Sequence, residues 1–253
     1  MLFFRKAGVF SFLAILASLI FIQSANAVSV SRGLKGNALG GGSHALGLGF
    51  SVVTSNQTDM NAVITENNAT NTANSKDMTS AYEFYANWIY RFGGSPYAFV
   101  LRPSYFMQES KGFGTGGAYN YNLNGFTVFP IVRMYPLEND FIHFFLQGGV
   151  GYGSLTGEID AATNNLKFNG SAFGAMAGMG VDFCFTESHC VTVEGNIRYL
   201  PVERNMSEGG NCSGSAITGI SQCGNGLEVE HGGSDLRTTM SGVLGVIGYT
   251  MNF

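Results

Sequence analysis

The stretch "CVTVEGNIRYLPV", Cys190 to Val202, decides the fold, because the character of its side chains changes with a period of two. One face carries Val191, Val193, Gly195, Ile197, Tyr199 and Pro201, and the other carries Thr192, Glu194, Asn196, Arg198 and Leu200. This period predicts a β-strand. The rest of the sequence has to show which of the two faces meets water.

The amino-terminal end predicts export. Arg5 and Lys6 precede an apolar run that ends in the small-residue site Ala25-Asn26-Ala27, so residues 1–27 are expected to be a secretory signal peptide. The alternative is a retained membrane anchor. Cleavage near Val28 leaves 11 Lys and Arg against 17 Asp and Glu, a formal charge of -6, which argues against a nucleic-acid partner.

The composition of the remaining chain favours a membrane barrel. The sequence is 45% hydrophobic and 13% aromatic, and its charged fraction of 12% is about half the usual value of roughly 25%. After the signal, no segment has the long apolar run of a membrane helix. A closed β-barrel is the other structure that satisfies every backbone group in lipid.

Eight alternating segments are separated by Gly, Asn, Ser and Pro, and they predict an all-β, antiparallel, up-and-down transmembrane barrel of about eight strands over residues 43–253. Residues 28–42 are expected to be a short periplasmic segment. Pro130 predicts a bulge or an irregular pairing in the fourth segment. The alternatives are a ten-stranded barrel that also uses Val28–Leu34 or part of the last loop, and a soluble periplasmic barrel of lipocalin type. The segments are residues 43–55, 80–92, 96–108, 121–135, 140–154, 167–185, 190–202 and 242–253.

The connections between these segments alternate in length. "GGSP", "PLEND" and "TESH" are tight, whereas Asn56–Thr79 and Glu203–Asp235 are long and polar. Outer-membrane barrels have short periplasmic turns and longer external loops. We therefore expect the two long loops outside the cell and both ends of the barrel in the periplasm.

The carboxy-terminal segment "GVLGVIGYTMNF" carries an apolar or aromatic residue at every second position and ends in Phe. It resembles the terminal signature of bacterial outer-membrane barrels, and "FLQGGVGYGSL" resembles the Gly-aromatic strands of small barrels in the OmpA and OmpW neighbourhood. The resemblance implies location in the bacterial outer membrane and insertion by the barrel assembly machinery. The residues that it assigns to the assembly signal are Ile247, Tyr249, Met251 and Phe253.

If the apolar faces meet lipid, the charged side chains of the strands collect in the barrel interior and pair there. Eight strands enclose room for side chains or a very small ligand, so we expect a filled lumen. Tyrosines and Trp88 near strand ends suggest two aromatic girdles at the membrane interfaces. The predicted interior charges are Glu83, Arg91, Arg102, Arg133, His143, Asp182, Glu194 and Arg198.

Four cysteines lie in a chain bound for an oxidising compartment. Cys184 and Cys190 flank a predicted periplasmic turn, and Cys212 and Cys223 share an external loop, so we predict disulfides within each pair. Free or partly paired thiols are the alternative. A metal site made by Cys184, His189 and Cys190 has a spacing that suits structural zinc poorly, and we predict neither a metal nor a cofactor.

The sequence gives little support for catalysis. "GGVGYG", Gly148–Gly153, lacks the spacing and the Lys-Ser/Thr of a phosphate loop. His231 lies near Ser234, Asp235, Glu228 and Glu230 in the last loop, and such a polar cluster also arises by chance, so a lipid-modifying enzyme is a remote alternative.

We predict a non-enzymatic monomer with a structural or surface-interaction role. Its long loops would contact lipopolysaccharide or an external partner, and its wall would contact outer-membrane lipid. The alternative is an OmpW-like conduit for small apolar solutes, which the inner residues Leu244, Val246, Phe106 and Leu200 would permit.

Overall fold

The computed structural model describes residues 42–210 and 217–253, which all belong to one compact unit, Arg32–Phe253. The predicted signal peptide, 1–27, lies outside the described residues. So does all of the predicted periplasmic segment except Gly42, and with it the extra strand that a ten-stranded barrel would take from Val28–Leu34.

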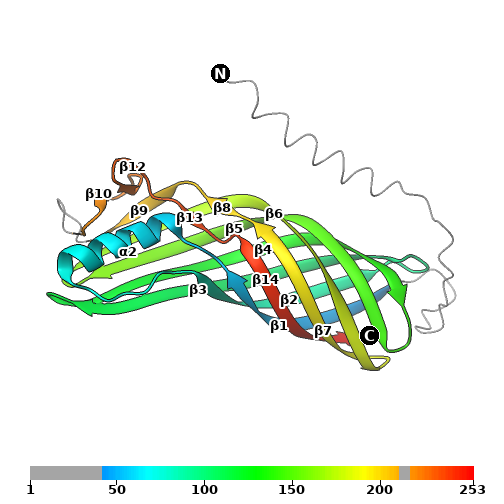
Figure 1. The fold of residues 1–253 in the computed structure, drawn as a ribbon. Helices are drawn as coiled ribbons and strands as arrows, with labels where there is room; N and C mark the ends of the chain where they lie inside the picture. Colours follow the sequence, from blue (N-terminus) through cyan, green and yellow to red (C-terminus); the bar gives the residue numbers. More distant parts are fainter. Residues whose placement is uncertain (1–41, 211–216) are drawn as a thin grey trace, which may run out of the picture. The chain divides into compact units, whose positions relative to one another are not determined.

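Eight antiparallel strands form a closed wall, which confirms the predicted fold (Figure 1). Their order around the wall is β5-β4-β3-β2-β1-β14-β7-β6, and pairing of β5 with β6 closes the ring. The first and last strands, β1 and β14, pair with each other, so both ends of the barrel lie at the end that carries the short turns. The wall strands are β1 (Ser43–Thr54), β2 (Ser80–Arg91), β3 (Tyr97–Gly114), β4 (Gly117–Glu138), β5 (Ile142–Ala161), β6 (Asn164–Thr186), β7 (His189–Tyr199) and β14 (Gly242–Asn252).

Strand β7 shows which face of the wall is apolar and exposed. Val193 and Ile197 are 47% and 67% exposed on the outer face, whereas Glu194 on the inner face is only 3% exposed. Large apolar side chains are exposed in the same way along the outer faces of the other seven wall strands. A soluble barrel of lipocalin type would bury its apolar side chains and expose its charges, so this pattern identifies a wall that faces lipid.

The predicted irregular pairing is present at Pro130, and a register shift lies further along the same strand. The β4–β5 register runs unchanged from Val128 to Ile131, although Phe129 and Pro130 themselves lack a paired residue on β5. The register shifts instead between Met134 and Leu137, where Pro136 lies. Proline cannot donate to the ladder, and the bulge has formed at the proline next to the strand end.

The hairpins β3–β4 and β5–β6 are longer than a membrane requires. The 22 residues of β4 extend roughly 70 Å at about 3.3 Å per residue. At a strand tilt of about 35–45° they rise about 50–60 Å, roughly twice the apolar band of about 25 Å. The two hairpins therefore project beyond the membrane at the end opposite the short turns.

Exposed aromatic side chains lie at two levels of the wall. Trp88, Tyr97 and Tyr249 lie near the short turns, and Tyr82 and Tyr105 lie further out on the same or neighbouring strands. The eight residue steps from Tyr97 to Tyr105 extend about 26 Å along β3, or about 20 Å along the barrel axis. This separation fits the spacing of two interfacial girdles.

The long loops are folded. The first contains the helix α2 (Thr58–Asn71), and the last contains short strands, of which β9 extends the sheet by pairing with the outer part of β6. The predicted strand Cys190–Val202 is two strands: β7 ends at Tyr199, and Pro201 and Val202 leave the wall to pair with β13. The strands of the last loop are β8 (Pro201–Val202), β9 (Asn205–Gly210), β10 (Ile220–Gln222), β11 (Glu230–His231), β12 (Ser234–Asp235) and β13 (Thr238–Thr239).

Among the described residues there is no helix with the length and apolar character needed to span a bilayer.

The position of the membrane can be tested with lysine on the outer face. Val150 is 68% exposed in the middle of β5, and Phe113 is 72% exposed near the tip of the β3–β4 hairpin. We expect Val150→Lys to lower the free energy of unfolding in lipid vesicles by about 2–4 kcal/mol, because it places a charge in hydrocarbon. Phe113→Lys should change it by less than about 1 kcal/mol. Equal costs at the two sites would contradict the assigned membrane level.

Candidate functional site

The barrel interior contains a buried network centred on the carboxylate of Glu194. Oε1 of Glu194 accepts hydrogen bonds from Nη2 of Arg102 at 2.8 Å and from Nη2 of Arg133 at 3.0 Å. All three side chains are almost completely buried. The guanidinium of Arg102 lies 4.7 Å from the ring centre of Tyr85, and that of Arg133 lies 3.7 Å from the ring centre of Phe145. Ion pairing and cation–π contacts together hold both arginines.

Neutral amides complete the network. Oε2 of Glu194 accepts from Nε2 of Gln147 at 2.9 Å and from Nδ2 of Asn196 at 3.0 Å. Asn87 accepts from Nε of Arg102 at 2.7 Å. Both oxygens of the carboxylate are thus saturated by donors from β3, β4, β5 and β7, which satisfies a charge that water does not reach.

A second ion pair lies closer to the outer end of the barrel. Arg198 on β7 and Glu83 on β2 are both buried, and Nη2 of Arg198 lies 2.7 Å from Oε2 of Glu83. Nη1 of Arg198 donates to Oε1 of Glu83 at 2.9 Å. Nε of Arg198 donates to the carbonyl oxygen of Met240 at 2.7 Å. This last bond attaches the last loop to the interior of the wall.

The remaining predicted charges lie at the end with the short turns, in a third group. Arg91 donates two hydrogen bonds to Glu138, at 2.8 and 2.9 Å, and Nε2 of His143 lies 3.5 Å from the same carboxylate. Asp182 accepts from the hydroxyl of Thr192 at 2.6 Å. The eight predicted charges therefore form three groups along the barrel axis.

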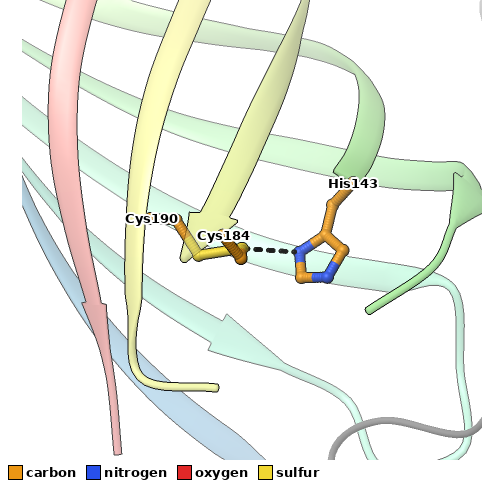
Figure 2. Close-up of side chains that lie close together, drawn as sticks. All are labelled: His143, Cys184 and Cys190. Atoms are coloured by element: carbon orange, nitrogen blue, oxygen red, sulfur yellow. Dashed lines mark hydrogen bonds between the residues drawn. A yellow bond between two sulfur atoms is a disulfide. The ribbon is translucent and has the colours of Figure 1, made fainter. Parts of the chain in front are cut away.

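Cys184 and Cys190 are joined by a disulfide, as predicted, and lie directly opposite each other on β6 and β7. Nδ1 of His143 lies 3.6 Å from the sulfur of Cys184 (Figure 2). Cys212 lies outside the described residues, so its bond to Cys223 stays a prediction.

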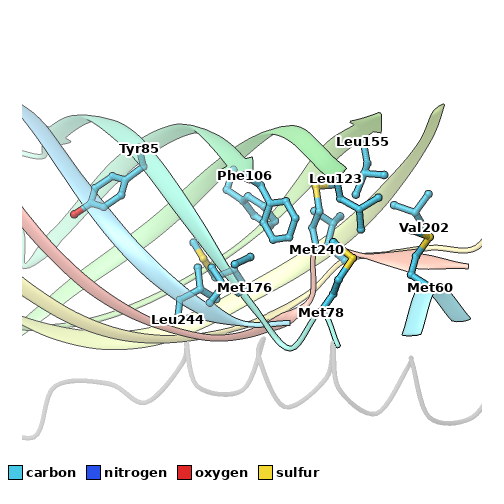
Figure 3. Close-up of a cluster of buried hydrophobic side chains, with 14 of the residues drawn as sticks. Met60, Met78, Tyr85, Phe106, Leu123, Leu155, Met176, Val202, Met240 and Leu244 are labelled. Carbon is cyan, nitrogen blue, oxygen red and sulfur yellow. The ribbon is translucent and has the colours of Figure 1, made fainter. Parts of the chain in front are cut away.

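From the level of the Arg198–Glu83 pair outward, apolar side chains pack inside the barrel (Figure 3). Met240 reaches in from the last loop against the interior glycines Gly125 and Gly153, where a β-carbon would lie 2.6 Å from its side chain. Met78 and Met60 come from the first loop and are buried. We call this set the apolar plug: Met60, Met78, Phe106, Leu123, Leu155, Met176, Leu200, Val202, Met240 and Leu244.

The sequence placed His231 in a polar cluster of the last loop, and the structure gives it a partner from the first loop. Its Nε2 lies 3.0 Å from Oε1 of Glu66 on α2. Ser234 pairs with His231 between β11 and β12. Among the described residues, the hydroxyl of Ser234 makes no hydrogen bond to the imidazole of His231. The contact joins the two long loops and lacks the arrangement of a nucleophile and its base.

Sequence reasoning missed several residues of these groups. Asn87, Gln147 and Asn196 have the same period-two phase as the charged residues, so their position on the inner face was available as a signal. Glu138 lies beyond the register shift of β4, and Met60, Met78 and Met240 lie in loops without periodicity. For these four residues the sequence pattern gives no signal.

On the outside of the barrel, a groove of about 750 Å³ lies where the last loop meets the outer faces of β5 and β6. Tyr152, Ser154 and Ser171 contribute its wall side, and Arg204, Met206 and Glu208 contribute its loop side. Glu208 accepts a hydrogen bond from Asn169 at 2.5 Å, and Arg204 pairs with Glu228. The groove therefore contains both signs of charge beside a wall that carries mostly hydroxyl and amide side chains.

The closed eight-stranded wall, its exposed apolar belt and its charged interior define a transmembrane β-barrel of the outer-membrane type. The crystal structure of the outer membrane protein OprG from Pseudomonas aeruginosa is similar, with a TM-score of 0.55 and 13% identity over 85% of this chain and 97% of that chain. At this identity the likeness concerns the fold, and the fold and the belt together place the chain in the bacterial outer membrane.

The attachment invasion locus protein Ail of Yersinia pestis matches more distantly. Its complex with the heparin analogue sucrose octasulfate gives a TM-score of 0.42 and 9% identity, over 84% of this chain and 99% of that chain. A second Ail structure gives a TM-score of 0.41 and 11% identity, over 85% and 99%. These values are too low to support any argument. No protein-family model and no curated protein matches the chain.

Removing the central carboxylate should destabilise the barrel. Glu194→Gln leaves Arg102 and Arg133 buried beside a neutral amide, and we expect it to lower the free energy of unfolding by about 3–5 kcal/mol. The matched control is Glu158→Gln, which breaks the exposed pair with Lys167 and should cost less than about 1 kcal/mol. Denaturant unfolding in lipid vesicles measures both. A cost below 1 kcal/mol for Glu194→Gln would show that the network does not hold the interior.

Proposed function

We propose that this protein is a sealed, non-enzymatic outer-membrane barrel that works through its external loops. The proposal rests on two layers of side chains that fill the lumen. The Glu194 network crosses the interior from β3 and β4 to β7, and the apolar plug lies above it. A solute would have to displace both layers.

The alternative role, a conduit for small apolar solutes, depends on the inner residues Leu244, Val246, Phe106 and Leu200. All four are buried, and Phe106, Leu200 and Leu244 belong to the apolar plug. Packed in this way they contribute to the closure. A conduit would require the loops that hold Met78 and Met240 to move out of the barrel.

Conductance in planar bilayers distinguishes the two roles. We expect the unmodified protein to give no resolved channels, and the double variant Glu194→Ala/Met240→Ala to give leakage, because it removes both the acceptor of the two arginines and the plug side chain that packs against Gly125 and Gly153. The control is Glu158→Ala on the external hairpin, which should stay silent. Steady channels in the unmodified protein would refute the sealed barrel and support the conduit.

The two long loops carry an excess of acidic side chains that a partner would meet. Asn56–Thr79 and Glu203–Asp235 together contain eight Asp and Glu against two Lys and Arg. Helix α2 is braced against the last loop by the contact of Glu66 with His231 and by the bond from the backbone N–H of Arg237 to Asp59. A braced, acidic surface repels the phosphates of lipopolysaccharide and attracts a basic partner. We infer that an external partner of these loops is a cationic protein surface.

Binding of a cationic probe tests this part of the proposal. The protein in vesicles of neutral lipid should bind a polylysine peptide with an affinity that falls as salt rises. Neutralising Glu203 and Glu230 to Gln should weaken binding at least about tenfold, and neutralising two acidic residues at the opposite end (Asp140 to Asn and Glu187 to Gln) should leave it unchanged. Equal binding by the loop variant and the unmodified protein would refute the cationic partner. It would not bear on the proposal that the barrel is sealed.

A further inference from the structure

The short-turn end of the lumen holds two sulfur atoms and an imidazole nitrogen in one small cluster. Cys184 and Cys190 are opposite each other on β6 and β7, and His143 reaches them from β5 (Figure 2). Their potential ligand atoms all lie within 4.8 Å of one another, and the three residues are buried. Three separate strands thus bring together the ligand types that soft metal ions prefer.

The spacing of the imidazole and the nearest sulfur suits a shared metal ion. Zinc–sulfur and zinc–nitrogen bonds measure about 2.3 and 2.0–2.1 Å, so two such ligands at a tetrahedral angle are about 3.6 Å apart. Nδ1 of His143 and Sγ of Cys184 are 3.6 Å apart in the structure. Cys190 has its side chain on the same inner face as Cys184, and opening the disulfide would leave both sulfurs beside the imidazole.

The other side of the imidazole is supported as metal-binding histidines usually are. Nε2 of His143 lies 3.5 Å from Oε1 of Glu138, and Arg91 holds that carboxylate with two hydrogen bonds. The guanidinium of Arg91 lies 4.0 Å from the ring centre of Tyr135. A carboxylate on the distal nitrogen fixes the ring and leaves Nδ1 free to act as a ligand.

We propose that this cluster is a redox-controlled site for a soft divalent ion such as Zn²⁺. In the disulfide form the sulfurs are bonded to each other and the site is closed. Two equivalents of a thiol reductant transfer two electrons, so the reductant becomes a disulfide and Cys184 and Cys190 become thiols. Zn²⁺ then displaces two protons and binds both thiolates and Nδ1 of His143, with the fourth position open to water.

The structure selects His143 over the histidine that the sequence suggested. His189 is adjacent to Cys190 along the chain, but its Nδ1 lies 2.5 Å from the hydroxyl of Tyr249, and its ring stacks on that tyrosine. Tyr249 belongs to the exposed outer face. His189 therefore serves as a matched control, because it is next to a ligand in sequence and outside the cluster in space.

The test uses the full mature chain folded in detergent micelles, with Zn²⁺ and Co²⁺ as probes. After reduction and removal of the reductant, the protein should bind one Zn²⁺ per chain in competition with a chromophoric chelator, and Co²⁺ should give thiolate charge-transfer absorption. The oxidised protein should do neither. The altered gel mobility of the unheated barrel shows in each case that the wall is intact.

Variants assign the ligands. Cys184→Ser with Cys190→Ser should abolish binding of Zn²⁺, and His143→Gln should weaken it at least tenfold and alter the Co²⁺ spectrum. Glu138→Gln should weaken it about tenfold through the orientation of the imidazole. His189→Gln should bind as the unmodified protein does.

Three results would overturn the proposal. The first is absence of Zn²⁺ binding by the reduced, folded protein. The second is equal binding by the His143→Gln variant and the unmodified protein, which would mean that the imidazole is not a ligand. The third is loss of the barrel on reduction, because the strands would then no longer hold the three ligands together.

Discussion

The carboxylate of Glu194 is the group on which the arrangement of the interior depends. It is buried, so it needs donors in place of water, and it receives them from β3, β4, β5 and β7. Each donor reaches it only if its strand has the observed register. A slip of one residue would turn the donor outward into lipid and an apolar residue inward. One charge therefore fixes four strands relative to one another. The same register places the apolar side chains of these strands on the outer face, where they form the apolar belt.

The interior changes from charged to apolar toward the outer end, and Arg198 lies at the change. Its guanidinium pairs with Glu83 in the wall and donates to the carbonyl oxygen of Met240 in the last loop. The plug is thus attached to the ion pairs as well as packed on them. Buried ion pairs contribute little net stability but are costly to break. They act here mainly by making other arrangements of the loops unfavourable.

The period of two was enough to predict the eight strands, their inner faces and the pairing of Cys184 with Cys190 across a short turn. It failed at the strand ends. Tyr199 ends β7 although the alternation continues to Val202, because Leu200 and Val202 join the plug and Pro201 cannot donate to the wall. The contact of His143 with Cys184 could not be predicted from this period either, because that contact depends on the β5–β6 register. Loop residues such as Met78 and Met240 carry no periodic signal, so their burial inside the outer end of the barrel could not be predicted.

The two ends of the barrel differ in the groups that they hold. At the outer end, β3–β4 and β5–β6 rise well beyond the apolar band and hold two acidic loops, which brace each other through Glu66 and His231. At the short-turn end, the wall stops close to the membrane, and polar groups lie within the rim beside the disulfide of Cys184 and Cys190. The Glu194 network separates the two ends. A change at the sulfur atoms can reach the loops through the register of β5, β6 and β7, the strands that carry His143, Cys184 and Cys190.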